Sequence, residues 1–244
     1  MTDGRINGGG RSSRNLTYGM LDSLGRAIVT GRFRDRPFPT EAELAKSHGV
    51  SRSVTREAMK MLAAKGLVSA RPRQGTAVRP SNNWNLFDPD VLRWLLERQF
   101  SVDLLRHFTQ LRLAIEPEAA ALAARHAEPA DRELIRAGLE RMEAAERGQD
   151  DTLDADIAFH VAVLNASKNP FYAQFRDVVA TALMKSIRFT NSIKGHSASI
   201  AEHQAVLDAV LAGDAAQARD AMRLLIANVL QLIEGAEPDG MGQL

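Results

Sequence analysis

The sequence has no cysteine among its 244 residues. This excludes disulfide bridges, thiolate metal sites and a cysteine nucleophile, and it fits a reducing compartment, so we expect a cytoplasmic protein. No apolar run approaches the ~20 residues that a helix needs to span a bilayer, and we expect no membrane association. The N-terminal segment MTDGRINGGGRSSRN has basic residues with no apolar stretch behind them, which predicts a disordered arm over residues 1–14 and no secretory signal.

The net charge of +1 hides an uneven distribution along the chain. Residues 1–80 carry 15 Lys and Arg against 6 Asp and Glu, whereas the remaining residues carry 16 against 24. A basic first third joined to an acidic remainder is typical of a nucleic-acid-binding domain fused to a second domain. A chance fluctuation is the alternative, and it is disfavoured because the same third carries a motif.

That motif is the stretch Phe38–Val78, whose pattern predicts two capped helices followed by a hairpin. Thr40 and Glu43 have the capping-box spacing of a helix start, and Ser51 is the N-cap candidate of the second helix. The residues after this helix alternate in polarity and turn at a glycine, as a short β wing does. The order predicts a winged helix-turn-helix domain over residues 15–80, a module that places its second helix in the DNA major groove.

The polar residues at the start of the second helix are candidates for reading DNA. A recognition helix contacts base edges with its N-terminal residues, and arginine can bond bidentately to guanine. In the wing, a glycine would permit a positive φ and a close approach to the DNA backbone, and arginines would contact phosphates. A solvated basic face is the alternative. The candidates are Arg52, Ser53, Thr55, Arg56, Arg73 and Gly75.

The rest of the chain shows only helical patterning, with no run that alternates long enough to form a strand. A polar, proline-containing segment predicts a linker over residues 81–90, and the pattern beyond it predicts an antiparallel helical bundle over residues 91–236, with a flexible tail at 237–244. The fold class is therefore mainly α: a winged helix-turn-helix with a small β wing, plus an all-helical bundle. The helix candidates in the second part are 88–99, 101–126, 130–148, 150–167, 169–193, 197–212 and 214–235.

One polar group in the helical part has the residue types of a metal site. Asp156 and His160 are four residues apart, so they lie on one face of a helix, and His203 follows on a later helix. One carboxylate and two imidazoles suit a divalent metal such as Zn, Ni, Mn or Fe, with open positions for water or a ligand. From the spacing alone, an intrahelical hydrogen bond or a surface pair is the alternative.

The segments PTEAELAKSHGVSRSVTREAMKMLAAKGLV and RPRQGTAV resemble the winged-helix domain of GntR-family bacterial transcription regulators. The chain departs from the family at Ala42, where an arginine is frequent, so the resemblance does not imply base reading from the first helix. The resemblance implies DNA contacts for Arg52, Ser53, Thr55, Arg56, Arg73, Gly75 and Thr76.

Three further segments, LRLAIEPEAAALAA, DIAFHVAVLNASKNP and IAEHQAVLDAVLAGDAAQARDAM, resemble the FCD effector domain of the FadR-type branch of that family. In many members an aspartate and three histidines hold a metal that, with an arginine, binds a carboxylate effector. The resemblance implies metal ligation by Asp156, His160 and His203, and effector contacts by Arg112, Asp156, His160, Asn169 and His203. The fourth family ligand falls at Leu225. Two arrangements stay open: a metal held by three side chains and effector oxygens, or direct binding of the effector by the polar residues.

Two of these assignments have a plainer interpretation. Arg112 can form an intrahelical pair with Glu116, worth about a few tenths of a kcal/mol when exposed. The segment NNWNLFDPDVLRWLLE resembles family members that respond to sugar acids of the galactonate type, but it could also be a linker with two aromatic anchors.

The predicted function is a ligand-responsive DNA-binding transcription regulator, and no enzyme. We expect a repressor of a sugar-acid or other carboxylate catabolic operon, acting as a homodimer on a palindromic operator because protein twofold symmetry mirrors operator symmetry. A metal-dependent enzyme built on Asp156, His160 and His203 is one alternative. An architectural DNA-binding protein without an effector is another.

Overall fold

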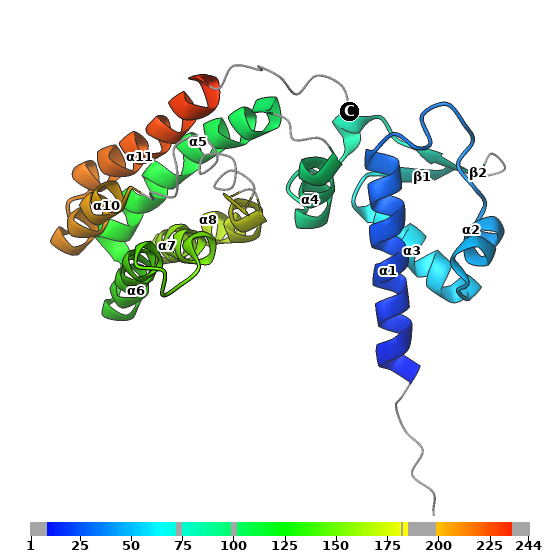
Figure 1. Cartoon of the computed structure of the whole chain (residues 1–244), viewed down its shortest axis with the longest axis horizontal. Coiled ribbons are helices and arrows are strands. Elements are labelled where there is room, and N and C mark those ends of the chain that lie inside the picture. Colours follow the sequence, from blue (N-terminus) through cyan, green and yellow to red (C-terminus); the bar gives the residue numbers. More distant parts are fainter. Residues whose placement is uncertain (1–8, 72–74, 99–101, 182, 185–198, 236–244) are drawn as a thin grey trace, which may run out of the picture. The chain divides into compact units, whose positions relative to one another are not determined.

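The computed structural model describes residues 9–71, 75–98, 102–181, 183–184 and 199–235 (Figure 1). The chain divides into two compact units, Met1–Gln99 and Phe100–Leu244, each with its own hydrophobic core. Among the described helices, none combines the length and the apolar character that crossing a membrane requires. The predicted tail at 237–244 lies outside the described residues.

The first unit is the predicted winged helix-turn-helix, followed by one further helix. Its two strands are antiparallel, with Val68 opposite Val78 and Arg71 opposite Gly75. The elements in order are α1 (Gly9–Val29), α2 (Glu41–His48), α3 (Arg52–Ala64), β1 (Val68–Arg71), β2 (Gly75–Val78), the 3-10 turn η1 (Ser81–Asn83) and α4 (Pro89–Arg98).

The predicted caps set the limits of α2 and α3. The Thr40 hydroxyl accepts from the Glu43 N–H at 3.3 Å, and the Glu43 carboxylate accepts from the Thr40 N–H at 2.8 Å. Gly49 ends α2 in the left-handed region at φ 63°, and the Ser51 hydroxyl accepts from the Val54 N–H at 3.3 Å to start α3. These confirmed caps determine which residues occupy the first turn of α3.

The first helix is longer than predicted. The apolar face expected within residues 17–31 is confirmed, since Met20, Leu21, Leu24, Ile28 and Val29 are buried in the core of the unit. However, α1 begins at Gly9, so the prediction of a disordered arm is wrong for residues 9–14. Extending an existing helix adds one hydrogen bond for each residue ordered, which costs far less than starting one. Residues 1–8 of the arm lie outside the described residues.

The helix after the linker belongs to the first unit. The predicted boundary placed residues 91–98 with the helical domain, whereas α4 packs on α1 and falls in unit 1. Trp94 is 1% exposed and its ring fills the space beside Gly25, where a Cβ would overlap the ring. The Trp94 indole N–H also donates to Asp22 Oδ1 at 2.8 Å. The structure differs from the prediction because Gly25 of α1 has no side chain, which leaves room for the Trp94 ring of α4.

The second unit is an all-helical bundle, as predicted. Its long helix α5 packs against α7, α10 and α11, and α6 packs against α7 and α10. The elements are α5 (Val102–His126), α6 (Pro129–Glu146), α7 (Thr152–Ala166), α8 (Pro170–Gln174), α10 (Ile200–Ala212) and α11 (Ala215–Gly235).

The helix predicted over residues 169–193 is interrupted. α8 ends at Gln174, the N–H of the next residue, Phe175, bonds to the Tyr172 carbonyl at 3.0 Å in the tighter 3-10 manner, and residues 176–181 resume a helix. Part of the predicted span, residues 185–193, lies outside the described residues.

Candidate functional site

A cluster of polar side chains lies in the interior of the second unit, where apolar residues would be expected. Arg112 and Glu116 come from α5, Asp156 and His160 from α7, and His203 from α10. All five residues are buried, with exposures between 1% and 9%. Arg112 and Glu116, like Asp156 and His160, are four residues apart, so each pair projects from one face of its helix. Burying polar and charged groups is costly, which makes this cluster the main candidate for a functional site.

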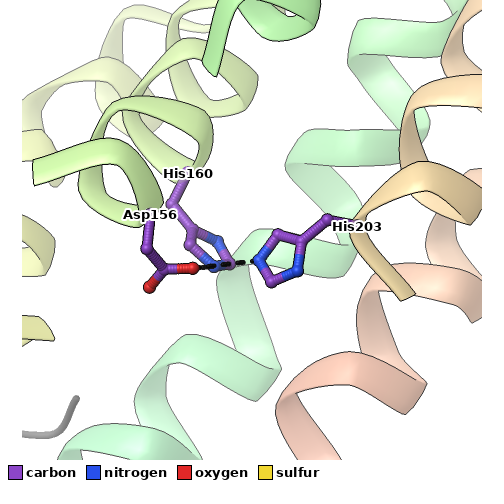
Figure 2. A group of neighbouring side chains, drawn as sticks. All are labelled: Asp156, His160 and His203. Atoms are coloured by element: carbon purple, nitrogen blue, oxygen red, sulfur yellow. Dashed lines mark ion pairs between the residues drawn. The ribbon is translucent and has the colours of Figure 1, made fainter. Parts of the chain in front are cut away.

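The three predicted metal ligands meet within this cluster. Figure 2 shows the Asp156 carboxylate beside the rings of His160 and His203. Asp156 Oδ1 lies 3.0 Å from His203 Nε2 and 3.8 Å from His160 Nε2, and the ligand atoms of the three residues all lie within 4.8 Å of one another. Atoms bound to one metal at about 2.0–2.2 Å are about 3 Å apart when their bonds are perpendicular. The three side chains are therefore close to the spacing that one divalent ion requires.

The environment of His203 indicates a positive charge at this point. Its Nδ1 lies 2.9 Å from the Ser199 carbonyl, which can only accept, so Nδ1 carries the hydrogen. Its Nε2 is buried and has no hydrogen-bond partner among the described residues, although Asp156 Oδ1 is close. A nitrogen lone pair and a carboxylate oxygen repel each other at this distance. Either a proton on Nε2 or a cation between the two atoms removes the repulsion, so the residues fit a metal.

His160 is held in the matching orientation. Its Nδ1 lies 2.6 Å from Glu116 Oε2, and because an ionised carboxylate only accepts, Nδ1 carries the hydrogen. Nε2 of His160 then carries the lone pair, and it lies 3.8 Å from Asp156 Oδ1 and 3.2 Å from Arg112 Nη2, which can donate to it. Both imidazoles thus present Nε2 to the same carboxylate while an acceptor holds Nδ1, the arrangement common among metal-ligating histidines.

When both imidazoles are neutral, the cluster carries one more negative charge than positive charge. Burial would raise the pKa of Glu116, but the charge of Arg112 and the hydrogen bonds from His160 and Arg112 outweigh it and lower that pKa to about 2. Burial acts in the same direction on Asp156, but His203, His160 and Arg112 hold its pKa below its ordinary value of 3.8. Two carboxylates then face one guanidinium and two imidazoles, so with neutral imidazoles the buried site carries an excess negative charge that favours a cation.

Arg112 is bonded to Glu116 and contacts His160 within this cluster. Its Nε donates to Glu116 Oε1 at 2.5 Å, and its Nη2 lies 3.2 Å from His160 Nε2. The intrahelical pair with Glu116, considered as the alternative to effector binding, therefore exists, but it is buried and joined to His160. Sequence reasoning treated Glu116 only as a partner of Arg112. The signal that could have found it was an Arg–Glu pair within an otherwise apolar helical segment.

Two other residues implied by the resemblance lie apart from the polar atoms of the cluster. Asn169 is the N-cap of α8, where its Oδ1 accepts from the Phe171 N–H at 3.0 Å. No hydrogen bond of the described residues joins Asn169 to the three ligand candidates. Leu225 is 3% exposed and belongs to the same apolar core as Phe159, whose ring is 5.0 Å from that of His203. An apolar side chain therefore occupies the position of the fourth family ligand.

The candidate DNA-reading residues divide into exposed and buried ones. Arg52, Ser53 and Arg56 are exposed in the first turns of α3, and Arg56 lies 3.5 Å from Glu41 in an exposed ion pair. The prediction that Thr55 faces solvent and contacts DNA is wrong, because Thr55 is fully buried. Its hydroxyl donates to the carbonyl of the α3 N-cap at 3.2 Å, and its helical position places it on the buried face with Ala58 and Leu62.

The wing presents its glycine as expected. Gly75 is exposed at φ 81°, a conformation that favours glycine, and a Cβ there would meet nothing within 4 Å. Thr76 is half-buried on the adjacent strand position. Arg73 lies outside the described residues.

Comparison with known proteins agrees with this division of the chain. Residues 20–78 match the bacterial regulatory proteins of the gntR family, and residues 107–228 match the FCD domain. The chain is 32% identical over 219 residues to the galactonate operon transcriptional repressor of Escherichia coli K12, covering 88% of this chain and 95% of the repressor. It is also 32% identical to the HTH-type transcriptional regulator LutR of Bacillus subtilis, covering 79% of this chain and 89% of LutR.

A solved structure shares the fold at lower identity. The protein described as Lar, which controls the expression of the Listeria monocytogenes agr system, superposes with a TM-score of 0.64 at 19% identity, covering 91% of this chain and 98% of that chain. The two named relatives are transcription regulators, which favours a regulator over the enzyme considered as an alternative. The chain belongs to the GntR family of bacterial transcription regulators, with an FCD domain as its second unit.

Proposed function

We propose that this protein is a repressor of an operon for the breakdown of a sugar acid or another small carboxylate. It binds a palindromic operator as a homodimer, and the carboxylate effector, bound in the helical unit, changes its affinity for that operator. The observation that carries the proposal is the buried convergence of Asp156, His160 and His203 beside Arg112, in a chain whose other unit exposes a basic recognition helix. An effector acts in this way by binding one arrangement of the protein more tightly than the other.

The DNA-binding part of the proposal rests on the start of α3. Arg52, Ser53 and Arg56 are exposed where recognition helices contact base edges, and Gly75 is exposed in the wing. We assign base or phosphate contacts to these four residues, with Thr76 and Arg73 as further wing contacts.

The effector part of the proposal uses a divalent metal. We assign Asp156 Oδ1, His160 Nε2 and His203 Nε2 as ligands of Zn, Ni or Mn. Bound there, the metal would supply a Lewis-acidic positive charge for the carboxylate of an effector. Arg112 adds a guanidinium charge that suits a carboxylate; its Nε and Nη2 bond to Glu116, and Nη2 also lies beside His160, within the same cluster.

Sugar acids come first among the candidate effectors. The printed name of one relative contains galactonate, and the linker segment resembles that of sugar-acid-responsive members. An aldonate offers a carboxylate for Arg112 or the metal, and hydroxyl groups for the remaining coordination positions.

A thermal-shift titration of the full chain tests the effector site. The chain is first treated with chelator, then supplied with Zn, Ni or Mn, and each sample is titrated with galactonate, gluconate, L-lactate and butyrate. We expect the sugar acids to raise the Tm more than butyrate does, and only with metal present. An absence of any shift with the sugar acids contradicts the sugar-acid assignment, and a shift that chelator leaves unchanged contradicts the metal.

A gel-shift titration on the upstream region of the protein's own gene tests the DNA site. Arg52→Ala and Arg56→Ala should each weaken specific binding by about 1–3 kcal/mol if the arginine contacts a guanine. Arg136→Ala, at an exposed arginine of α6, is the matched control and should bind like the wild type. Equal weakening by all three substitutions would indicate non-specific charge effects and contradict the assigned recognition surface.

A further inference from the structure

We propose that Glu116 is a positioning residue of the metal site: its carboxylate holds Arg112 and His160 together and keeps His160 in the form that ligates through Nε2. This inference rests on the proposed metal site and names a residue that acts through a ligand. Glu116 does not belong to the three ligand candidates, whose converging atoms come from Asp156, His160 and His203.

Both oxygens of Glu116 are used by buried partners. Oε1 accepts from Arg112 Nε at 2.5 Å, and Oε2 accepts from Arg112 Nη2 at 3.3 Å. The same Oε2 lies 2.6 Å from His160 Nδ1. A single side chain, 1% exposed, therefore connects the arginine of α5 to a histidine of α7. An exposed pair of this kind would lose most of its influence to water, but here no solvent competes for the carboxylate.

The bond to Nδ1 decides which nitrogen of His160 can bind a metal. A neutral imidazole carries one hydrogen, and the nitrogen without it is the acceptor or metal ligand. With the Glu116 carboxylate at Nδ1, the hydrogen stays on that atom and the lone pair is on Nε2, which lies 3.8 Å from Asp156 Oδ1. Without the carboxylate, the hydrogen can occupy Nε2, and the ring then presents an N–H to the metal position.

The other histidine shows why Glu116 is the residue to test. His203 is held at Nδ1 by the Ser199 carbonyl, a main-chain acceptor that no substitution removes. The Nδ1 of His160 is instead held by a side-chain acceptor, the Glu116 carboxylate. The two imidazoles thus have equivalent outer contacts, and only one of these contacts is open to mutation.

A matched control lies on the same helix. Glu118 forms a bidentate pair with Arg219, at 2.6 Å and 2.9 Å, but its side chain is 42% exposed and its partner lies on α11. Glu116→Gln and Glu118→Gln make the same chemical change two residues apart. Only Glu116→Gln removes a carboxylate that contacts a ligand candidate.

The experiment compares the full-length wild type, Glu116→Gln and Glu118→Gln after chelator treatment. Calorimetric titration with Zn, Ni and Mn gives the metal affinities in the absence of effector. Nitrogen-15 spectra of the histidine side chains give the tautomer of His160 in the metal-free protein, assigned by the signal that His160→Gln removes. We expect Glu116→Gln to bind metal about 10–100-fold more weakly, because an uncharged amide oxygen is a weaker acceptor for Nδ1–H than a carboxylate, while Glu118→Gln behaves like the wild type.

A second variant covers the case in which Glu116→Gln does not fold. Arg112→Met/Glu116→Leu removes both buried charges together, a replacement that is often neutral for stability. It should show the same loss of metal affinity, and it should also lose the Nδ1–H form because leucine offers Nδ1 no acceptor. Wild-type metal affinity in Glu116→Gln, or an unchanged His160 tautomer in Arg112→Met/Glu116→Leu, overturns the proposal.

Failure of the metal site itself has a different signature. A wild-type chain that binds none of the three metals contradicts the metal assignment in the proposed function. The tautomer of His160 then still reports on Glu116: if the Nδ1–H form persists in Arg112→Met/Glu116→Leu, the positioning role is overturned as well.

Discussion

Asp22 in the first unit and Glu116 in the second are carboxylates that each hold partners from two helices. Asp22 binds Arg26 on its own helix and Arg93 and Trp94 on α4. Both carboxylates have a pKa of about 2. They differ in burial, since the Asp22 side chain is 37% exposed and that of Glu116 is 1% exposed.

The difference shows that burial, more than pairing, sets how much each carboxylate matters. Burial raises the pKa of Asp22, but hydrogen bonds from Trp94, Arg26 and Arg93 outweigh it. Water can replace the bonds from Arg26 and Arg93 if Asp22 is lost, because both side chains are partly exposed. No water can replace Glu116 beside Arg112, which is 2% exposed. The ion pairs of Asp22 with Arg26 and Arg93 are therefore open to water, whereas those of Glu116 lie in the interior of the second unit, where removing one partner costs more.

The largest predicted effect breaks the buried pair. Glu116→Leu should destabilise the second unit by about 3–5 kcal/mol, because it leaves Arg112 as an uncompensated buried charge. Adding Arg112→Met should restore most of the loss. Urea unfolding, with hydrogen exchange of α5 to locate the change, measures both. A double variant as unstable as the sum of the single ones would contradict this account.

The next prediction asks whether packing holds the first unit together. Gly25→Ala should cost about 1–3 kcal/mol, because its Cβ would overlap the buried Trp94 ring. Gly19→Ala on the same helix is the control: a Cβ there meets nothing within 4 Å, so alanine should be neutral or stabilising by up to about 1 kcal/mol. Equal effects of the two substitutions on the Tm would show that the packing of Trp94 beside Gly25 does not contribute to stability.

A third prediction concerns an additional metal ligand at the buried site of the second unit. Leu225→His places an imidazole where the family has its fourth ligand. In chelator, the buried and unpaired ring should cost about 1–3 kcal/mol. Metal at a concentration of about 100 times its Kd should increase the free energy of unfolding by about 2.7 kcal/mol. Chemical unfolding with and without Zn or Ni measures the difference, and a loss that no metal restores would place residue 225 away from the metal site.

The smallest predicted effect belongs to Asp22. Asp22→Asn should change the free energy of unfolding by less than about 1 kcal/mol at neutral pH, as expected for exposed ion pairs. Glu116→Gln should have the larger effect, and the reverse order in urea unfolding would show that burial does not set how much each carboxylate contributes to stability.

The pH dependence follows from the same two pKa values. A carboxyl group with a lowered folded pKa stabilises the fold fully above its unfolded pKa and loses that contribution as the pH falls toward its folded pKa. For Glu116 the window runs from its ordinary 4.5 down to about 2, and for Asp22 from 3.8 to about 2. Stability should therefore decline through these windows. Glu116→Gln should flatten the decline more than Asp22→Asn, as measured by urea unfolding at a series of pH values.

Much of the first unit could be predicted because its signals are local. The capping box at Thr40, the cap at Ser51 and the positive φ of Gly75 are confirmed, and each depends on residues close in the chain. Thr55 was the local error. Its polar side chain suggested solvent, but the helical position places it on the buried face, where its hydroxyl bonds to the backbone.

The candidate site could be predicted in its residue types but not in its full extent. Asp156 and His160 have a spacing that a helix turns into proximity, and the structure brings His203 to them. Glu116 was missed because the contact that defines it joins α5 to α7, across 44 positions of sequence. Its partner at i+4 gave only an ordinary intrahelical pair.

The sequence by itself determined the family, the two-part organisation, the caps that start α2 and α3, and the three candidate ligands. The organisation, the caps and the Asp156–His160 pair follow from composition or from motifs whose parts lie near one another in the chain, and the family follows from the resemblance of whole segments. Only the tertiary structure decided that α4 packs with the first unit, that Thr55 is buried, and that Glu116 joins Arg112 to His160. These outcomes depend on the space left between packed helices, such as the room for Trp94 beside Gly25, and that space is set by side chains that are distant in the sequence.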